Sequence, residues 1–248
     1  MIASASHTAP TAHLASARQK LIVALDFAAA PAALEFVERL DGSCTWFKVG
    51  LELYLAAGNS VIEQLRKRGY SVFLDLKFHD IPKTVAGAVR SAAATGASLL
   101  TLHGLGGPAM LEAAANEAAR LSSRPKLLAV TLLTSMDTAQ IQAVGLPVPA
   151  SDQVLKLARM AREAGMDGLV ASPLETAALR TALGQEPLLV IPGIRSADAA
   201  ADDQKRTASP AAAIADGASM LVVGRPITQA ADPAAAARSI LQQIASVS

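Results

Sequence analysis

The sequence is short of cysteine, aromatic residues and net charge. Its one cysteine, Cys44, lies ahead of an apolar stretch, where we expect a small buried residue, and it excludes a disulfide within the chain. A reducing cytoplasm is therefore the expected compartment. The 22 basic and 21 acidic residues leave a net charge of +1, which gives no broad field for nucleic acid or a membrane surface. No apolar run approaches the ~18–20 residues that a membrane span needs.

The bulk composition indicates one well-buried globular domain. Hydrophobic residues make up 52% of the 248 residues and aromatic residues only 3%, so the core must be aliphatic. Barrels of about 250 residues commonly form a single domain. The first twenty residues are rich in Ala, Ser and Thr and lack the apolar segment of a secretory signal. We expect residues 1–19 to form a disordered extension and residues 20–248 to form the domain.

Apolar, strand-like runs alternate with Ala-rich helical patterns along the chain. Such alternation indicates parallel βαβ units, and eight of each predict an α/β fold, a single (β/α)8 TIM barrel with its active site at the C-terminal ends of the strands. The expected strands are Leu21–Asp26, Thr45–Val49, Ser71–Lys77, Ser98–His103, Leu127–Leu132, Gly168–Ala171, Leu188–Ile191 and Ser219–Val223. The expected helices are Pro31–Leu40, Ser60–Arg68, Pro82–Ala94, Pro108–Leu121, Asp152–Glu163, Leu174–Ala182, Pro210–Ala215 and Pro233–Ala245.

The third expected strand carries a dense group of charges. Asp75 and Lys77 are two residues apart, so their side chains should point to the same face, and Asp80 follows where the strand should end. Ile81-Pro82 then opens a helix, since proline is tolerated in a first turn. Two acids and a base at the C-terminal end of a strand indicate catalytic residues. Asp80 could instead be a helix N-cap, and Asp75 with Lys77 a structural ion pair.

Polar residues end several other strands. Asp26 ends the first strand, Lys48 lies on the second, and Thr134 and Ser135 follow the fifth. At the C-terminal face of a barrel, such residues are typical of catalysis or ligand binding. The alternatives are rim charges in solvent and hydroxyl groups that cap a turn. His103, which ends the fourth strand, fits a satisfied core histidine.

The loops after the last two strands predict a phosphate site. Gly193-Ile194-Arg195 follows the seventh strand, and Gly224-Arg225 follows the eighth, where Arg225–Thr228 fits the start of a short helix. Barrels commonly bind phosphate here, because glycine allows close backbone approach and arginine supplies charge. Ordinary glycine turns with solvated arginines are the alternative. The polar segment Ser196–Arg206, which contains Gln204, is a candidate lid.

Together these stretches resemble the orotidine 5′-phosphate decarboxylase family. The likeness spans about residues 20–245, and its motifs agree in order and at spacing consistent with a barrel. The matching stretches are Leu25-Asp26, Phe47-Lys48-Val49-Gly50, Asp75-Leu76-Lys77-Phe78-His79-Asp80-Ile81-Pro82-x-Thr84, Leu133-Thr134-Ser135, Pro192-Gly193-Ile194-Arg195, Gln204 and Val223-Gly224-Arg225-Pro226-Ile227-Thr228.

The resemblance implies the decarboxylation of orotidine 5′-monophosphate (OMP) to uridine 5′-monophosphate (UMP) and carbon dioxide, the last step of de novo pyrimidine synthesis. It implies no metal and no organic cofactor. It also implies a homodimer with active sites at the subunit interface. In the family, the second aspartate of the motif and the threonine after it reach the partner's site, so Asp80 and Thr84 would act there.

The resemblance also implies roles for the remaining residues. Lys77 would stabilise and protonate the carbanion left at C6, with Asp75 holding it in place. Lys48, Asp75, Lys77 and the partner's Asp80 would alternate in charge. The ribose would bind Asp26, Lys48 and the partner's Thr84, the pyrimidine edge Thr134 and Ser135, and the phosphate Arg195, Gln204, Gly224 and Arg225, with Ile81 also among the substrate-binding residues.

Two rival functions stay open on the sequence. Metal-dependent sugar-phosphate decarboxylases and synthases of the same barrel superfamily share an Asp-x-Lys-x-x-Asp motif and hold a metal with acidic residues. Lys48 and the Phe78-His79-Asp80-Ile81-Pro82 context disfavour this rival. A non-catalytic nucleotide-binding barrel is the second rival, and it would have no need for the alternating charges.

Overall fold

The computed structural model of the chain describes residues 9–146, 149–195 and 206–247, with side chains from residue 13 onward. Eight parallel strands close into a barrel in chain order, which confirms the predicted TIM barrel. Each strand end lies within two residues of its predicted position. The strands are β1 (Leu21–Ala24), β2 (Trp46–Gly50), β3 (Ser71–Phe78), β4 (Leu99–His103), β5 (Lys126–Val130), β6 (Gly168–Val170), β7 (Leu188–Ile191) and β8 (Met220–Val223).

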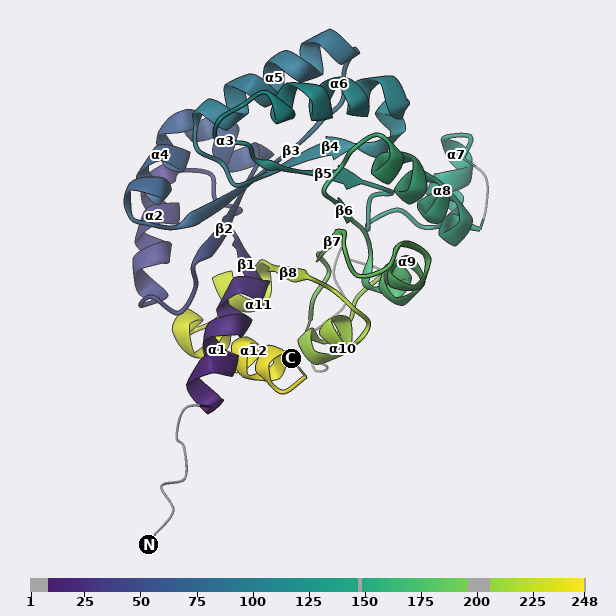
Figure 1. Cartoon of the computed structure of the whole chain (residues 1–248). Coiled ribbons are helices and arrows are strands. Elements are labelled where there is room, and N and C mark those ends of the chain that lie inside the picture. Colours follow the sequence, from purple (N-terminus) through teal and green to yellow (C-terminus); the bar gives the residue numbers. More distant parts are fainter. Residues whose placement is uncertain (1–8, 147–148, 196–205, 248) are drawn as a thin grey trace, which may run out of the picture.

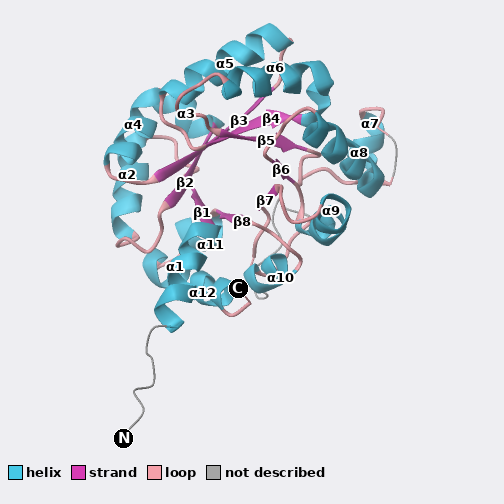
Figure 2. Ribbon diagram, viewed as in Figure 1, coloured by secondary structure: helices cyan, strands magenta, loops and turns pink. Residues whose placement is uncertain are grey.

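Helices surround the ring of strands on the outside, as Figures 1 and 2 show. Within the described ranges, no helix is long and apolar enough to cross a bilayer. The helices that match the predicted pattern are α2 (Ala30–Arg39), α4 (Asn59–Lys67), α5 (Pro82–Ala94), α6 (Gly107–Ala119), α8 (Ala150–Glu163), α9 (Thr176–Leu183), α10 (Pro210–Ala215), α11 (Arg225–Thr228) and α12 (Pro233–Ala245). The short helices that the sequence pattern missed are α3 (Leu51–Ala57), η1 (Gly104–Gly106), α7 (Thr138–Ala143) and η2 (Pro173–Glu175).

The N-terminal segment departs from the prediction. A helix, α1 (Ala9–Lys20), runs directly into β1 and packs beside α12 (Figure 1). Ala17 on this helix is fully buried. The predicted disordered extension over residues 1–19 is therefore wrong from Ala9 onward, and residues 1–8 lie outside the described residues. Alanine is the strongest helix former, and its small side chain allows close packing without a marked apolar stripe.

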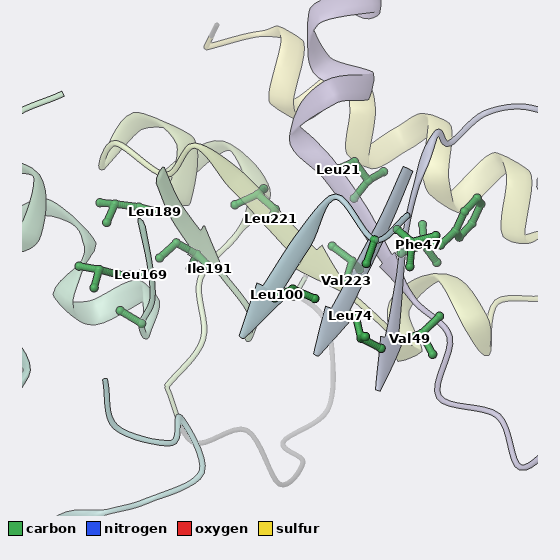
Figure 3. Close-up of a cluster of buried hydrophobic side chains, with 14 of the residues drawn as sticks. Leu21, Phe47, Val49, Leu74, Leu100, Leu169, Leu189, Ile191, Leu221 and Val223 are labelled. Carbon is green, nitrogen blue, oxygen red and sulfur yellow. The ribbon is translucent and has the colours of Figure 1, made fainter. Parts of the chain in front are cut away.

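The core has two layers because side chains alternate along each strand. Outward-facing residues such as Leu21, Phe47 and Leu74 (Figure 3) belong to the larger cluster. This cluster also includes residues of the surrounding helices. Inward-facing residues such as Ile22 and Phe73 fill the barrel. The inner layer supports the polar side chains that follow at the strand ends.

Cys44, just before β2, is buried as the sequence predicted, with 1% of its surface exposed. Burial raises the pKa of its thiol to about 12, although the nearby charge of Arg18 acts in the opposite direction. The thiol is therefore protonated at neutral pH and is not a nucleophile in the folded chain.

Candidate active site

A cavity of about 290 Å³ opens at the C-terminal ends of the strands. Its apolar floor includes Ala24, Phe73 and Val222 from the inner layer of the barrel. This volume is near the lower end of the range typical of small-molecule sites. The predicted site residues that line the cavity are Asp26, Lys48, Asp75, Lys77, Thr134, Ser135, Arg195, Gly224 and Arg225.

Four charged side chains of alternating sign line the β1–β3 side of the cavity, and we call them the charge chain: Asp26, Lys48, Asp75 and Lys77. The Lys48 ammonium lies 3.0 Å from Asp26 Oδ1 and 3.7 Å from Asp75 Oδ2. The Lys77 ammonium lies 2.9 Å from Asp75 Oδ1. Each ammonium is thus held by at least one carboxylate, which allows these charges to sit close together at the edge of an apolar core.

The backbone reaches this arrangement through an irregularity at the end of β3. The pairing of β3 with β4 shifts register between Leu74 and Phe78, and Lys77 has a φ of 52°, in the left-handed region. That region is unfavourable for a lysine by about 1–2 kcal/mol. The buried hydroxyl of Thr101 on β4 accepts a hydrogen bond from the Lys77 N–H at 2.9 Å and donates one to Asp75 Oδ1 at 2.9 Å. Thr101 therefore fixes the strained turn and the carboxylate together.

Asp75 is ionised in this setting. Burial alone would raise the pKa of its carboxyl group. The charges of Lys48 and Lys77, together with hydrogen bonds from Lys77 and Thr101, outweigh burial and hold the pKa below its ordinary value. The site therefore contains a carboxylate with an ammonium group on each side.

Gly50, at the end of β2, leaves room for the Lys48 ammonium. A Cβ atom at this position would lie 2.9 Å from Lys48 Nζ and 3.6 Å from Asp26 Oδ1. A side chain here would push the ammonium away from the Asp26 carboxylate. Glycine at position 50 therefore preserves the first link of the charge chain.

The β5–β8 part of the cavity is lined by loop residues. Thr134 and Ser135 follow β5, and Arg195 and Arg225 follow β7 and β8. The Arg195 N–H donates to the Ala208 carbonyl at 3.0 Å, which ties this loop to the segment that leads into α10. Residues with hydroxyl and guanidinium groups thus complete the lining of the cavity.

Three predicted residues, Asp80, Ile81 and Thr84, do not line the cavity of their own chain. All three are exposed, and Asp80 Oδ1 accepts a hydrogen bond from the Ile81 N–H at 2.6 Å. The N-cap residue of α5 is Ile81, so the alternative reading of Asp80 as the N-cap is wrong. Gln204 and nearly all of the candidate lid lie outside the described residues.

The two histidines near the motif form a stacked pair. The rings of His79 and His103 have centroids 5.4 Å apart. His103 Nδ1 accepts a hydrogen bond from the Leu105 N–H at 3.3 Å. Burial, and then the charges of His79 and Lys77, lower the pKa of His103. His103 is thus a neutral, satisfied residue, as the sequence suggested.

Two features of the site were missed in the sequence. Thr101 lies in an apolar strand, but its alternation with Leu99 and His103 would have placed it inside the barrel. An ion pair between Glu175 and Arg206 lies close to the β5 loop, and no local pattern predicts it. Among the described residues, no group of three or more His, Cys, Asp or Glu side chains is arranged to hold a metal ion.

Comparisons with known proteins give matches that agree with one another. Residues 19–240 match the model of the orotidine 5′-phosphate decarboxylase / HUMPS family. The chain is 50% identical to orotidine 5′-phosphate decarboxylase of Chromobacterium violaceum over 90% of this chain and 91% of that protein. It is 51% identical to the enzyme of the same name from Laribacter hongkongensis, over 94% and 96% of the two chains. The crystal structure of orotidine 5′-phosphate decarboxylase from Lactobacillus acidophilus superposes with a TM-score of 0.81 and 39% identity, over 91% and 99% of the two chains.

Proposed function

This chain belongs to the orotidine 5′-phosphate decarboxylase / HUMPS family, and on that premise we propose how its own residues carry out the reaction. The reaction is the decarboxylation of OMP to UMP in pyrimidine biosynthesis. One observation carries the mechanism: the Lys77 ammonium is held 2.9 Å from Asp75 at the wall of the cavity. The site thus presents a fixed positive charge with a transferable proton.

Lys77 is the group that meets the negative charge of the reaction. When the bond from C6 to the carboxylate breaks, the electron pair stays on C6 as a localised carbanion. The ammonium stabilises this charge and then donates one proton to C6, and the neutral amine regains a proton from solvent. Because Asp75 and Thr101 already fix this region, little reorganisation accompanies the step.

Asp75 acts mainly by positioning Lys77. Its carboxylate would also repel the carboxylate of the substrate, and two such charges 4 Å apart at an effective dielectric near 20 repel by about 4 kcal/mol. Rate accelerations of about 10¹⁷ correspond to roughly 23 kcal/mol. Repulsion is therefore a minor contribution, and preorganised charge around the carbanion is the main one.

The rest of the cavity holds the nucleotide. Asp26 and Lys48 bind the ribose hydroxyls, and Thr134 and Ser135 bind the pyrimidine edge. Arg195 and Arg225 bind the phosphate together with the backbone at Gly224 and the side chain of Gln204. In support, Gly224 lines the cavity next to Asp26: a Cβ atom at position 224 would lie 3.7 Å from Asp26 Oδ2, in ordinary van der Waals contact.

The chain acts as a cytoplasmic homodimer in which Asp80, Ile81 and Thr84 complete the partner's cavity. In support, the Ile81 side chain is 65% exposed. The Asp80 carboxylate accepts a hydrogen bond from the Ile81 N–H, and Asp80 does not line the cavity of its own chain. Exposed polar and apolar groups together at a strand exit suit an interface better than free solvent.

Neighbouring strand exits carry further exposed apolar side chains. Leu55 on α3, after β2, is 80% exposed, and Leu105 on η1, after β4, is 41% exposed. These positions flank the exit of β3, because β2, β3 and β4 are adjacent in the barrel. The partner would cover this face and bring its Asp80 to the cavity.

The two rival functions are separated by one assay. Metal binding is disfavoured because Asp26 and Asp75 are each engaged by a lysine ammonium. The loss of OMP absorbance is followed with purified protein in excess EDTA, and full activity is expected. Activity that requires added Mg²⁺ would favour a metal-dependent decarboxylase. Binding of UMP without turnover of OMP would favour a nucleotide sensor.

Mixing two inactive variants tests the shared site. Asp26→Ala disables the cavity of its own chain, and Asp80→Ala disables the cavity of the partner. A hybrid dimer retains one intact cavity, so exchange of subunits should restore about one quarter of wild-type activity. Hybrid dimers that form, as seen by native mass spectrometry, but stay inactive would reject the cross-subunit role of Asp80.

A further inference from the structure

A buried ion pair lies behind the β5 loop, and the proposed function assigns no role to either of its residues. Arg206 Nη1 donates to Glu175 Oε1, and Arg206 Nη2 donates to the Leu133 carbonyl at 3.2 Å. The two side chains are 12% and 9% exposed. One guanidinium group thus bridges a carboxylate on η2 and a backbone carbonyl on the β5 loop.

The Glu175 end of this bridge is anchored to β6. Glu175 Oε2 accepts a hydrogen bond from the Ser172 N–H at 3.1 Å, and the Ser172 hydroxyl accepts one from the Leu174 N–H at 3.2 Å. These reciprocal bonds form a capping box that fixes η2 directly after the barrel strand. The carboxylate is therefore a rigid support for the guanidinium group.

The Leu133 end of the bridge reaches the substrate cavity. Leu133 lines the cavity, and the next two residues, Thr134 and Ser135, line it as well. Fixing a carbonyl oxygen also fixes the peptide plane that leads into Thr134. Arg206 itself does not line the cavity.

The bridge is poorly built for stability. Burial raises the pKa of Glu175 even though Arg206 and the Ser172 hydrogen bonds oppose that shift. Arg206 Nε is buried and has no hydrogen-bond partner among the described residues. Buried ion pairs are weak evidence for stability, and an unsatisfied donor adds a further cost. A role in geometry explains the arrangement better.

We propose that Arg206 is a positioning residue for base recognition: oriented by Glu175, its guanidinium group holds the Leu133 carbonyl and so sets Thr134 and Ser135 against the pyrimidine ring. This inference rests on the proposed function, in which those two hydroxyls bind the pyrimidine edge. It assigns to Arg206 no direct contact with the substrate.

The test compares a ligand that has the base with one that lacks it. Dissociation constants of UMP and of ribose 5-phosphate are measured by calorimetry for the wild type and Arg206→Lys. Lysine keeps a positive charge beside Glu175 but lacks the planar fork that reaches two acceptors. UMP binding should weaken about tenfold, the value of roughly one hydrogen bond, while ribose 5-phosphate binding stays unchanged.

A double variant guards against a folding defect. Glu175→Gln with Arg206→Met removes both buried charges, leaves no unpaired ion, and keeps an acceptor for the Ser172 N–H. It should show the same selective loss of UMP binding. The matched control is Arg124→Ala, which breaks the Arg124–Asp167 pair, 2.8 Å long, at the opposite end of the barrel. This control should bind both ligands as the wild type does.

Equal weakening of both ligands would place Arg206 on the phosphate side or in the general fold and would overturn the inference. Unchanged UMP binding in both variants would overturn it as well. Turnover of OMP by the wild type is measured in the same preparation. Absence of turnover would reject the proposed function. The role of Arg206 is tested separately, by the ratio of the dissociation constants of UMP and ribose 5-phosphate.

Discussion

The two sides of the cavity are built differently. On the β1–β3 side, Asp26, Lys48, Asp75 and Lys77 lie on a strand or within two residues of one, and ion pairs of 2.9–3.7 Å link them. On the β5–β8 side, the polar groups lie on loops and a short helix after the strands. Charge stabilisation needs groups that are fixed before the reaction, whereas recognition tolerates segments that adjust.

The largest expected effect is on the strand side. Lys77→Ala removes the charge that faces the carbanion and the proton that is transferred, so kcat should fall by about 10³-fold or more. The fold should survive, because Asp75 retains two partners: the Lys48 ammonium at 3.7 Å and the Thr101 hydroxyl. Steady-state kinetics and thermal melting measure the two effects. Near-normal turnover would end the assignment of Lys77 as the proton donor.

The loop side should respond in binding rather than in chemistry. Arg225→Ala removes a charge-assisted contact to phosphate, so KM for OMP should rise by about 100-fold. Decarboxylation of the nucleoside orotidine, which has no phosphate, should change little. Both substrates are assayed side by side. An equal loss of activity toward OMP and orotidine would show that the loop side also contributes to the chemical step. The two sides of the cavity would then not differ in function.

Thr101 tests how far the fixed geometry matters. Thr101→Val keeps the shape but loses the donor to Asp75 and the acceptor for the Lys77 N–H, so kcat should fall about tenfold with KM nearly unchanged. Thr101→Ser should restore most of the rate. A Val variant with normal kcat would show that the Lys77 turn holds its shape without the hydroxyl.

The smallest expected effect is on stability in acid. The folded-state pKa of Asp75 is lowered from the ordinary value of 3.8, so its ionised form stabilises the fold above pH 3.8, and that contribution is lost as pH falls through the folded-state pKa. Urea denaturation between pH 3 and pH 7 should show a smaller acid-induced loss for Asp75→Asn than for the wild type. The same dependence of the unfolding free energy on pH in both proteins would contradict this expectation.

The sequence predicts the frame of the molecule better than its fine geometry. Strand positions follow from apolar runs at regular spacing, and charged residues at strand ends indicate the side of the barrel that carries the cavity. The left-handed turn at Lys77 has no local signal, because lysine is not typical of that region. The contact between Thr101 and Asp75 spans 26 residues, and that between Arg206 and Glu175 spans 31. Pairings of that kind appear only after the chain has folded.

Cys44 gives the chain a built-in reporter of its own opening. Its thiol is buried and its pKa is raised to about 12, so an alkylating reagent finds almost no thiolate in the closed barrel. Alkylation of Cys44 at neutral pH therefore requires local unfolding that exposes the start of β2. The alkylation rate in native buffer then measures how often this part of the barrel opens, with no probe introduced.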